Sequence, residues 1–314
     1  MAPTIAAVIP AYNLGPYIGR AVESALRQTR ALDEIVVVDD GSTDQTPQVL
    51  AGFGGRIRVI RQANAGASAA RNAGVLAAKS DWIAFLDGDD EWLPEAIALL
   101  GGIVERHPEL VWATGNFFRC DCDAGHRQWE DITPPRMEAI RKHLAGGEVF
   151  DSYFVAHNLF AAGCTDTMIL RRDAIIEAGM FLSGQKRIND MDLWFRVAYR
   201  HPAIGFVPQP LAVYHLDIPG STIKAHCDPQ IIAEFLHRHF ELADGFGKAK
   251  DFRPCAAKML GSWLTMLLDQ RQGREVRDLL REFGGLYSRY FVATNRIKSY
   301  FPRLGQWYER IKGR

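Results

Sequence analysis

Short apolar runs alternate with helix-like periodicity over the first third of the chain. The runs that we expect to form strands are Ile5–Ile9, Ile35–Val38, Ile57–Ile60, Trp82–Leu86 and Leu110–Thr114. The intervening helices are expected to begin at Gly15 and Thr46 and to cover Ala67–Lys79 and Pro94–Arg106. Because continuous apolar runs are typical of parallel strands covered on both faces, the pattern predicts a doubly wound α/β domain.

The pattern loses its regularity after residue 115 and becomes purely helical near the end. A loop is expected at Thr133–Pro135, a helix within residues 185–200 and a strand at Ile204–Val207. The clearest late helices are Ile231–Phe240, Pro254–Asp269 and Val276–Phe283. We therefore expect an α/β domain over residues 1–225 and a helical C-terminal extension over residues 226–314.

The composition is that of a globular protein without bulk affinity for polyanions. The 314 residues are 47% hydrophobic, and 37 basic residues balance 37 acidic ones. This neutrality gives no support to nucleic-acid binding, so we expect no nucleic-acid partner.

The start of the chain and its cysteines favour a cytoplasmic location. The first ten residues lack the basic start and apolar core of a signal peptide, and no apolar stretch reaches the roughly 18 residues of a membrane span. The five cysteines are odd in number and scattered, as expected of reduced thiols. Cys120 and Cys122 lack a usual zinc spacing, so we expect them to be structural.

Three carboxylates follow the fourth apolar run, at Asp87, Asp89 and Asp90. Carboxylates this close in sequence repel one another and raise one another's pKa, so a cation between them would be favourable. The Asp87-x-Asp89 pattern supplies oxygen ligands that suit Mg²⁺ or Mn²⁺. An acidic turn ahead of the helix at Pro94 is the alternative.

Polar side chains also follow the first two apolar runs. Tyr12 and Asn13 come after the first run, and Asp39 and Asp40 come after the second. In a doubly wound sheet the carboxyl ends of the strands share one edge, where ligands bind. We therefore expect all these side chains to converge on one crevice, although Asp39 and Asp40 alone would also fit a turn.

Three further candidates lie elsewhere. Arg71, in an alanine-rich segment, would suit a diphosphate or would pair with an acid. Asp190, ahead of an amphipathic helix, would suit a general base or a helix N-cap. His215, ahead of a turn, would bind a metal or a phosphate or be structural. The residues alone leave each choice open.

Together these motifs resemble the family 2 glycosyltransferases, the inverting group with the GT-A fold. The motifs that carry the resemblance are Pro10-Ala-Tyr12-Asn13, Val38-Asp-Asp40-Gly-Ser-Thr-Asp44, Gly66-x-Ser-x-Ala-Arg71-Asn72-x-Gly74, Phe85-Leu-Asp87-Gly-Asp89-Asp90 and Asp190-x-Asp192-Leu-Trp194-x-Arg196. The resemblance covers about residues 3–225 and implies a mostly parallel GT-A type sheet flanked by helices. The helical extension lies outside it.

The resemblance also implies a role for each candidate. The nucleotide-sugar donor would be bound by Pro10, Tyr12, Asp39, Asp40, Arg71, Asp87 and Gly88. The metal would be held by Asp89, Asp87 and His215. Asp190 would be the catalytic base, with Asn189, Asp192 and Trp194 on the acceptor side. Asn189 stands where family members often have glutamate, so a contact made by that glutamate is not carried over to this chain.

The implied activity is a metal-dependent, inverting transfer of a sugar from a nucleotide-diphosphate sugar to a hydroxyl. The resemblance favours a UDP-linked donor, Mn²⁺ or Mg²⁺ as cofactor, and a glycan or lipid-linked acceptor in polysaccharide biosynthesis of the cell envelope. A sugar nucleotidyltransferase is one alternative, although the loop after the first strand has no basic residue before Arg20. A non-catalytic nucleotide-binding module is the other.

The last stretch of the chain is rich in basic and aromatic residues. From Tyr287 to Arg314, seven basic residues face a single acid, Glu309. This composition is typical of a helix at an anionic membrane surface and would place the protein at the inner face of the cell membrane. A solvated helix end or a subunit contact, and hence an oligomer, is the alternative.

Overall fold

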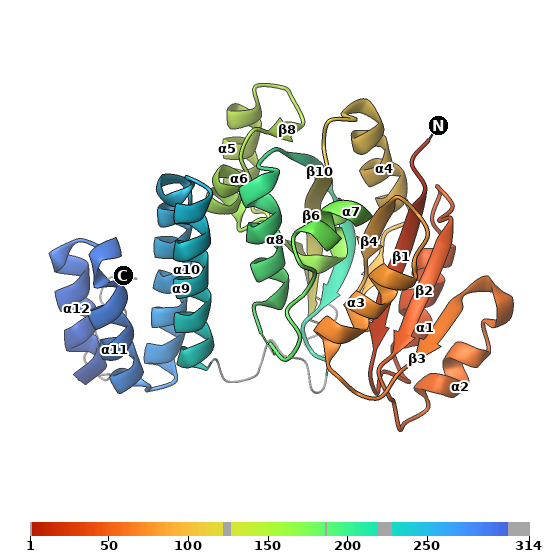
Figure 1. Cartoon of the computed structure of the whole chain (residues 1–314), viewed down its shortest axis with the longest axis horizontal. Coiled ribbons are helices and arrows are strands. Elements are labelled where there is room, and N and C mark those ends of the chain that lie inside the picture. The colour runs from red at the N-terminus through yellow and green to blue at the C-terminus, as the bar shows by residue number, and fades with distance from the viewer. Residues whose placement is uncertain (1, 122–126, 186, 219–227, 301–314) are drawn as a thin grey trace. The chain divides into compact units, whose positions relative to one another are not determined.

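The computed structural model describes residues 2–121, 127–185, 187–218 and 228–300 (Figure 1). The chain divides into two compact units, residues 1–224 and residues 225–314. Three features noted in the sequence lie outside the described residues: Cys122, Cys227 and the basic and aromatic residues beyond Tyr300.

In the described part of the first unit, one mixed sheet of ten strands has helices packed against it (Figure 1). Its strands are β1 (Ile5–Ala11), β2 (Glu34–Asp39), β3 (Arg58–Arg61), β4 (Trp82–Phe85), β5 (Glu91–Trp92), β6 (Trp112–Asp121), β7 (Arg127–Glu130), β8 (Val149–Phe150), β9 (Ile169–Arg171) and β10 (Ile204–His215). The order along the sheet is β3-β2-β1-β4-β9-β6-β10-β5, with β7 beside β6 and β8 beside β10. Each predicted strand is present, although β6 and β10 are longer than their apolar runs.

The half of the sheet formed by β3, β2, β1 and β4 is parallel, as the apolar runs predicted. All seven residues of β1 are buried, and Val8 pairs with Val36 on one side and with Phe85 on the other. The carboxyl ends of these strands therefore share one edge, where Tyr12, Asp40 and Asp87 follow them.

The other half is mixed, because β9 runs antiparallel between β4 and β6. Ile169, the first residue of β9, pairs with Ala84 near the end of β4. The residues just before β9 therefore lie at the same edge as the residues just after β4. This strand was not expected from the sequence.

The helices of the first unit are α1 (Ile18–Leu26), α2 (Thr46–Ala51), α3 (Ala67–Ala77), α4 (Ala96–Arg106), α5 (Pro134–Leu144), α6 (Tyr153–Phe160), α7 (Arg172–Glu177) and α8 (Asn189–Arg200). The loop expected at Thr133–Pro135 is wrong, because α5 begins at Pro134. Proline suits the first helical turn, since its fixed φ is helical and its missing N–H would have had no partner there. A Cβ at Gly74 of α3 would collide with Val8, so glycine lets this helix lie close to β1.

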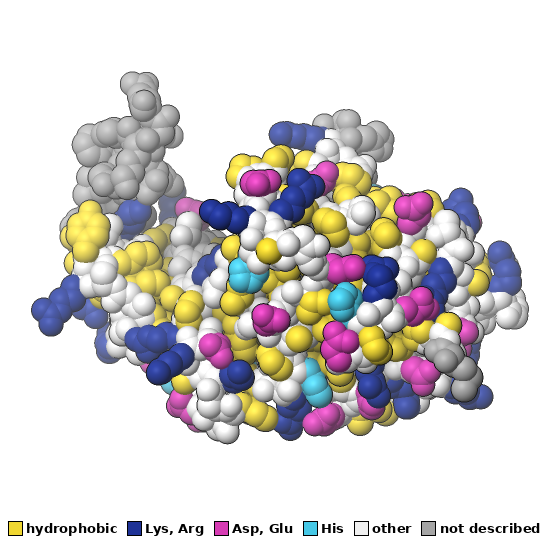
Figure 2. All heavy atoms as spheres, turned by 90° about the horizontal axis from the view of Figure 1, so that it is seen from above, with side chains coloured by type: hydrophobic (Ala, Val, Ile, Leu, Met, Phe, Trp, Pro, Cys, Tyr) yellow, Lys and Arg dark blue, Asp and Glu magenta, His cyan; other side chains and the backbone are white. Residues whose placement is uncertain are grey.

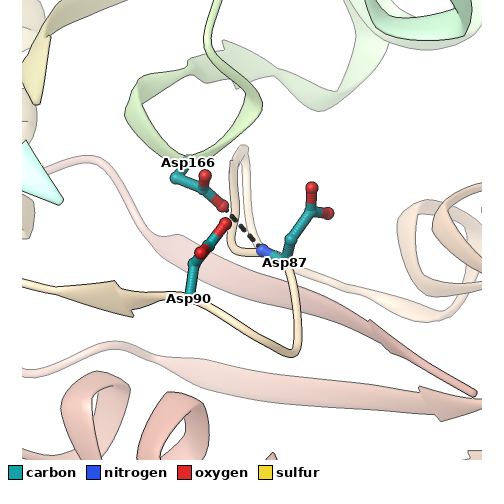
Figure 3. Close-up of side chains that lie close together, drawn as sticks. All are labelled: Asp87, Asp90 and Asp166. Carbon is teal, nitrogen blue, oxygen red and sulfur yellow. Dashed lines mark hydrogen bonds between the residues drawn. The ribbon is translucent and has the colours of Figure 1, made fainter. Parts of the chain in front are cut away.

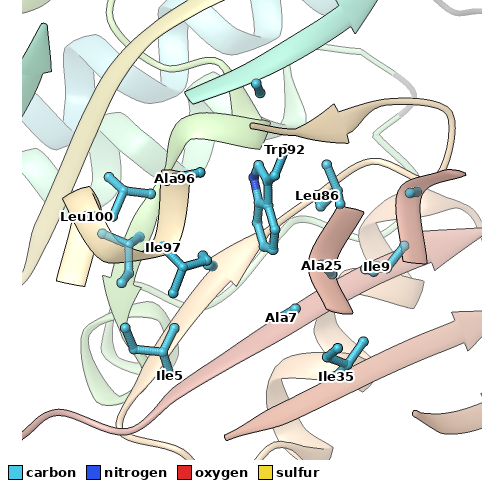
Figure 4. Close-up of a cluster of buried hydrophobic side chains, with 14 of the residues drawn as sticks. Ile5, Ala7, Ile9, Ala25, Ile35, Leu86, Trp92, Ala96, Ile97 and Leu100 are labelled. Atoms are coloured by element: carbon cyan, nitrogen blue, oxygen red, sulfur yellow. The ribbon is translucent and has the colours of Figure 1, made fainter. Parts of the chain in front are cut away.

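The core beside the parallel strands connects directly to the edge where they end. Ile5, Ala7 and Ile9 alternate along β1 in one buried cluster with Trp92 and Leu100 (Figure 4). The indole N–H of Trp92 donates a 2.6 Å hydrogen bond to the backbone carbonyl of Asp166, which lies in the loop just before β9, where Thr165–Thr167 form a short 3-10 helix. The packed core therefore fixes the position of that loop.

The second unit is helical, as expected. It comprises α9 (Pro229–Gly245), α10 (Ala249–Asp269), α11 (Gly273–Phe283) and α12 (Arg289–Tyr300). The start expected for α10 at Pro254 is wrong, because the helix begins at Ala249 and includes the proline. Among the described residues, no helix combines the length and the hydropathy that crossing a membrane requires.

On the face of the molecule in Figure 2, acidic and basic side chains are interspersed.

Candidate active site

Two hollows adjoin at the edge where the parallel strands end. The first, named the Tyr12 hollow, has a volume of about 410 Å³, and the second, named the Asp190 hollow, about 450 Å³. Ala67, Arg71, Asp87 and Tyr214 line both. The two hollows therefore meet along these four side chains.

Most of the candidate residues line one or both of the two hollows. The Tyr12 hollow is lined by Pro10, Tyr12, Asp40, Arg71, Asp87, Gly88 and Asp89. The Asp190 hollow is lined by Arg71, Asp87, Asn189, Asp190 and Trp194. Three candidates line neither hollow: Asp39, Asp192 and His215.

The ends of β1 and β2 build one wall of the Tyr12 hollow. Tyr12 follows β1 directly and is 47% exposed, which leaves its ring available to a flat ligand. The next residue, Asn13, has a left-handed backbone (φ 52°), and its amide donates a 2.9 Å hydrogen bond to the hydroxyl of Ser42 after β2. The Asn13 side-chain oxygen accepts a 2.9 Å bond from the amide of Thr43. These reciprocal bonds fix the loop that presents Tyr12.

The two aspartates at the end of β2 have different surroundings. Asp39 is buried, accepts a 2.9 Å bond from the Ser42 amide and lies 3.5 Å from Arg61. Asp40 accepts bonds from the amides of Ala65 (3.0 Å) and Gly66 (2.8 Å) and from a Gln62 side chain. Asp39 therefore stabilises its own turn, whereas Asp40 ties the loop before α3 to the hollow.

A buried ion pair lies where the two hollows meet. Arg71 of α3 is 6% exposed and donates to the carboxylate of Asp87. Its guanidinium carbon lies 5.4 Å from the ring centroid of Phe181, and its Nε atom has no hydrogen-bond partner among the described residues. Burial lowers the pKa of Arg71, but the charge and hydrogen bond of Asp87, together with the charges of Asp190 and Asp166, raise it above its usual value, so the arginine stays charged.

Asp87, Asp90 and Asp166 form a carboxylate trio in which one oxygen of each lies within 4.8 Å of the others (Figure 3). The backbone amide of Asp87 donates a 2.7 Å bond to Asp166, and the amide of His215 donates a 2.7 Å bond to Asp90. Glycine at position 88 lets this turn approach β1, because a Cβ there would lie 2.7 Å from the Pro10 carbonyl oxygen.

The three carboxylates of the trio carry like charges, which repel one another. Burial first, and then the charge of Asp166, raises the pKa of Asp90 well above its usual range. Burial and the charge of Asp87 likewise raise the pKa of Asp166. Asp89 lies beside the trio, and burial together with the Asp87 charge raises its pKa to about 6. A divalent cation would relieve this repulsion, and the all-oxygen donor set fits Mg²⁺ or Mn²⁺.

Two predicted metal ligands lie outside the trio. Asp89 lines the Tyr12 hollow. The His215 Nε2 atom lies 3.2 Å from a carboxylate oxygen of Glu91, and its backbone amide contacts the trio through Asp90.

Asp190 lies at the start of α8, inside its own hollow. Its carboxylate accepts a 2.7 Å bond from the Met191 amide and a 3.3 Å bond from the Thr165 hydroxyl. Burial raises the pKa of the Asp190 carboxyl, while the nearby charge of Arg71 opposes that rise. A carboxylate with a raised pKa that faces a hollow has the properties of a general base.

The three acceptor-side candidates differ in their contacts. Asn189 donates a 2.9 Å bond to Ser68, and the indole N–H of Trp194 donates a 3.0 Å bond to the carbonyl of Gly163. Asp192 is fully buried and forms a 2.7 Å ion pair with Arg196. Asn189 and Trp194 thus shape the hollow, whereas Asp192 lies behind it.

The loop before β9, including Thr165 and Asp166, was not expected at the site from the sequence. The available signal was an acid just ahead of the apolar run Met168–Leu170. An acid before a strand reaches the ligand-binding edge only if that strand is antiparallel, whereas the apolar runs predict parallel strands. Tyr214, which the sequence places beside His215 as a possible metal or phosphate contact, lines both hollows.

Comparison with known proteins defines the class of this fold and site. The family model described as glycosyl transferase family 2 matches residues 6–177, which is more than half of the chain. The chain therefore belongs to family 2 of the glycosyltransferases.

Individual relatives agree with this assignment. The uncharacterized glycosyltransferase EpsJ of Bacillus subtilis (strain 168) is 43% identical over 144 residues, covering 45% of this chain and 40% of that protein. The putative glycosyltransferase EpsH of the same strain is 39% identical over 232 residues, covering 70% of this chain and 62% of its own length. The chain thus spans less than two thirds of the length of either relative.

The fold is similar to that of solved structures of S. aureus TarS. The crystal structure of residues 1–349 of S. aureus TarS in complex with UDP-GlcNAc superposes with a TM-score of 0.61 at 18% identity, covering 95% of this chain and 89% of that one. At this identity the match establishes the GT-A-like fold alone.

Proposed function

We propose that this chain transfers a sugar from a nucleotide-diphosphate sugar to an acceptor hydroxyl, with inversion at the anomeric carbon. The observation that carries the proposal is the meeting of the two hollows at the Arg71–Asp87 pair. The carboxylate trio that suits a cation spans this junction, because Asp87 lines both hollows, Asp90 lines the Tyr12 hollow and Asp166 lines the Asp190 hollow. Asp190 lies on the far side of the junction from the Tyr12 hollow. A donor and an acceptor bound in the two hollows would have their reacting atoms at this junction.

The Tyr12 hollow is proposed to bind the donor. Tyr12 and Pro10 would pack against the nucleotide base, and Asp40 would lie beside it. Ala67 at the start of α3 lines the hollow, and a helix N-terminus favours a diphosphate. Arg71 has an unpartnered Nε atom and a charge that would also favour the diphosphate.

The cation site would adjoin the leaving diphosphate. Asp87, Asp90 and Asp166 would hold Mn²⁺ or Mg²⁺, with Asp89 close by, and His215 would act through its amide contact to Asp90. A cation bound there would stabilise the negative charge of the departing diphosphate.

The Asp190 hollow is proposed to bind the acceptor. Asp190 would remove the proton of the attacking hydroxyl, and Thr165 would keep its carboxylate oriented. Asn189 and Trp194 would position the acceptor. Because attack would come from the side opposite the leaving group, the anomeric configuration would invert.

Named relatives support the choice of substrates. The TarS structure contains UDP-GlcNAc, which favours a UDP-linked donor. A chondroitin synthase of Pasteurella multocida is 43% identical over 100 residues, 31% of this chain and 10% of the synthase, and the succinoglycan biosynthesis protein ExoO of Rhizobium meliloti is 45% identical over 97. A glycan or lipid-linked acceptor in cell-envelope polysaccharide biosynthesis is therefore the acceptor we propose.

A donor screen tests the activity against its alternatives. The chain is incubated with each of a set of nucleotide sugars, with Mn²⁺, Mg²⁺ or EDTA, and the release of nucleoside diphosphate is measured. We expect release from a UDP-sugar that requires the metal. Release of diphosphate from UTP and a sugar 1-phosphate would instead indicate a nucleotidyltransferase. UDP binding without any turnover would indicate a binding module.

We also propose that the second unit contacts the inner face of the cell membrane. Tyr290, Ile297 and Tyr300 of α12 are 76%, 59% and 63% exposed, and α12 carries three basic residues and no acid. An exposed apolar stripe with basic flanks suits an anionic bilayer. Sedimentation with phosphatidylglycerol vesicles should be lost when Tyr290 and Ile297 are replaced by serine. Unchanged sedimentation would contradict the membrane contact, and a stable oligomer that the same substitutions dissociate would favour a subunit contact instead.

A further inference from the structure

We propose that the Asp190 hollow continues onto the hairpin of β6 and β7, and that this surface binds a second sugar unit of a glycan acceptor. The inference rests on the acceptor role proposed for the Asp190 hollow. Phe117, Arg119 and Asp131 line that hollow, and Arg119 is directly paired with Trp129 across the two strands. Paired residues of an antiparallel ladder point to the same face, so Trp129 extends the lining outward.

The position of Trp129 suits a saccharide chain that leaves the hollow. Its side chain is 39% exposed. Its cross-strand partner, Arg119, is two residues beyond Phe117 on β6, so Trp129 is displaced from Phe117 by about 7 Å along the strands. That step is comparable to the advance of a glycan by one sugar. A sugar bound beside Asp190 would therefore place its neighbour near the exposed indole.

The side chains around Trp129 supply the polar part of such a site. The guanidinium carbon of Arg127 lies 5.6 Å from its ring centroid, and Arg127 is paired across the strands with Asp121. Arg119 forms a 2.6 Å ion pair with Asp131. A sugar ring has an apolar face of C–H groups and a rim of hydroxyls, so an aromatic ring flanked by charged donors and acceptors matches both parts.

The charge balance of this face favours a saccharide over other large ligands. Two arginines, Arg119 and Arg127, are matched by two aspartates, Asp121 and Asp131. An anionic bilayer or a nucleic acid would require an excess of positive charge. Sugar hydroxyls instead require donors and acceptors together, which the two pairs provide.

The test compares the wild-type chain with Trp129→Ala, Trp129→Phe and Phe246→Ala. Phe246 has the same 39% exposure as Trp129 and follows α9 in the second unit, so it controls for the loss of an exposed aromatic ring. Each protein is applied, with UDP and Mn²⁺, to a printed array of bacterial glycans and their component single sugars. Hydrolysis of the nucleotide-sugar donor by water is measured in parallel.

We expect the wild type and Phe246→Ala to bind longer glycans more tightly than single sugars. Trp129→Ala should lose about tenfold in affinity for the longer glycans with donor hydrolysis unchanged, and Trp129→Phe should retain most of that affinity. The subsite is overturned if the wild type hydrolyses donor but binds no glycan or shows no preference for length, or if Trp129→Ala binds as the wild type does. Absence of donor hydrolysis in every protein would contradict the transfer activity itself.

Discussion

The two hollows differ in how the fold makes them. The Tyr12 hollow is formed at the ends of parallel strands, and its loops are bonded to one another, as Asn13 is to Ser42 and Thr43. The Asp190 hollow is formed by the mixed half of the sheet, from the β6–β7 hairpin, the start of α8 and the loop before β9. The position of the Tyr12 hollow follows from the parallel strands themselves. The Asp190 hollow depends instead on the hairpin and loops, whose positions the parallel strands do not determine. We infer that donor binding resides in the former and acceptor choice in the latter.

The largest effect is expected when the proposed base, Asp190, is replaced, because sugar transfer should fall while donor binding in the Tyr12 hollow should not change. Asp190→Asn keeps the shape of the side chain but removes its basicity, so sugar transfer should fall by about 100-fold to 10,000-fold. The dissociation constant of UDP should stay within twofold of the wild type, because Asp190 does not line the Tyr12 hollow. Asp173→Asn, an exposed aspartate of α7, is the matched control. Steady-state kinetics and calorimetry provide the two readouts, and full transfer activity in Asp190→Asn would remove it from the mechanism.

The next effect tests which carboxylates hold the cation. Asp166→Asn can still accept the bond from the Asp87 amide but loses its charge. Its affinity for Mn²⁺, measured in the presence of UDP, should fall by about 10-fold to 100-fold. Unchanged affinity in Asp166→Asn together with a loss in His215→Ala would favour the ligand set first expected from the sequence.

A smaller effect is expected at the outer wall of the donor side. Tyr12→Ala removes the exposed ring that follows β1, and UDP should bind about tenfold more weakly. Tyr12→Phe should bind nearly as the wild type does, because it keeps the ring. Equal UDP affinity in all three proteins would exclude stacking of the base on this residue.

The smallest effect links the carboxylates to stability. Asp89, Asp90 and Asp166 have raised folded-state pKa values, so near pH 5 the folded protein binds more protons than the unfolded chain. Without metal, the free energy of unfolding should therefore fall as pH rises from about 4 through the pKa of Asp89, about 6. Mn²⁺ binds the ionised carboxylates, so it should raise Tm by several degrees at pH 7.5 and by less at pH 5. Equal shifts at both pH values would contradict this coupling.

The difference between the two hollows also explains which site residues could be predicted from the sequence. Apolar runs with polar ends located β1, β2 and β4, and therefore Tyr12, Asp40 and Asp87, because parallel strands end at one edge. Asp166 was missed because its contact with Asp87 depends on the antiparallel direction of β9, which a run of three residues does not encode. Asp39 and Asp40 are adjacent in sequence, yet only the folded loops determine that Asp40 lines the hollow. Pro134 was assigned to a loop because proline both ends and begins helices.

The most direct test of the central claim is a crystal structure of the chain with UDP and Mn²⁺. We expect the uracil ring against Tyr12, the diphosphate near Arg71 and the metal among Asp87, Asp90 and Asp166, with the Asp190 hollow left open for an acceptor. Nucleotide bound in the Asp190 hollow, or a metal bound away from the three carboxylates, would contradict the assignment of the two hollows to donor and acceptor.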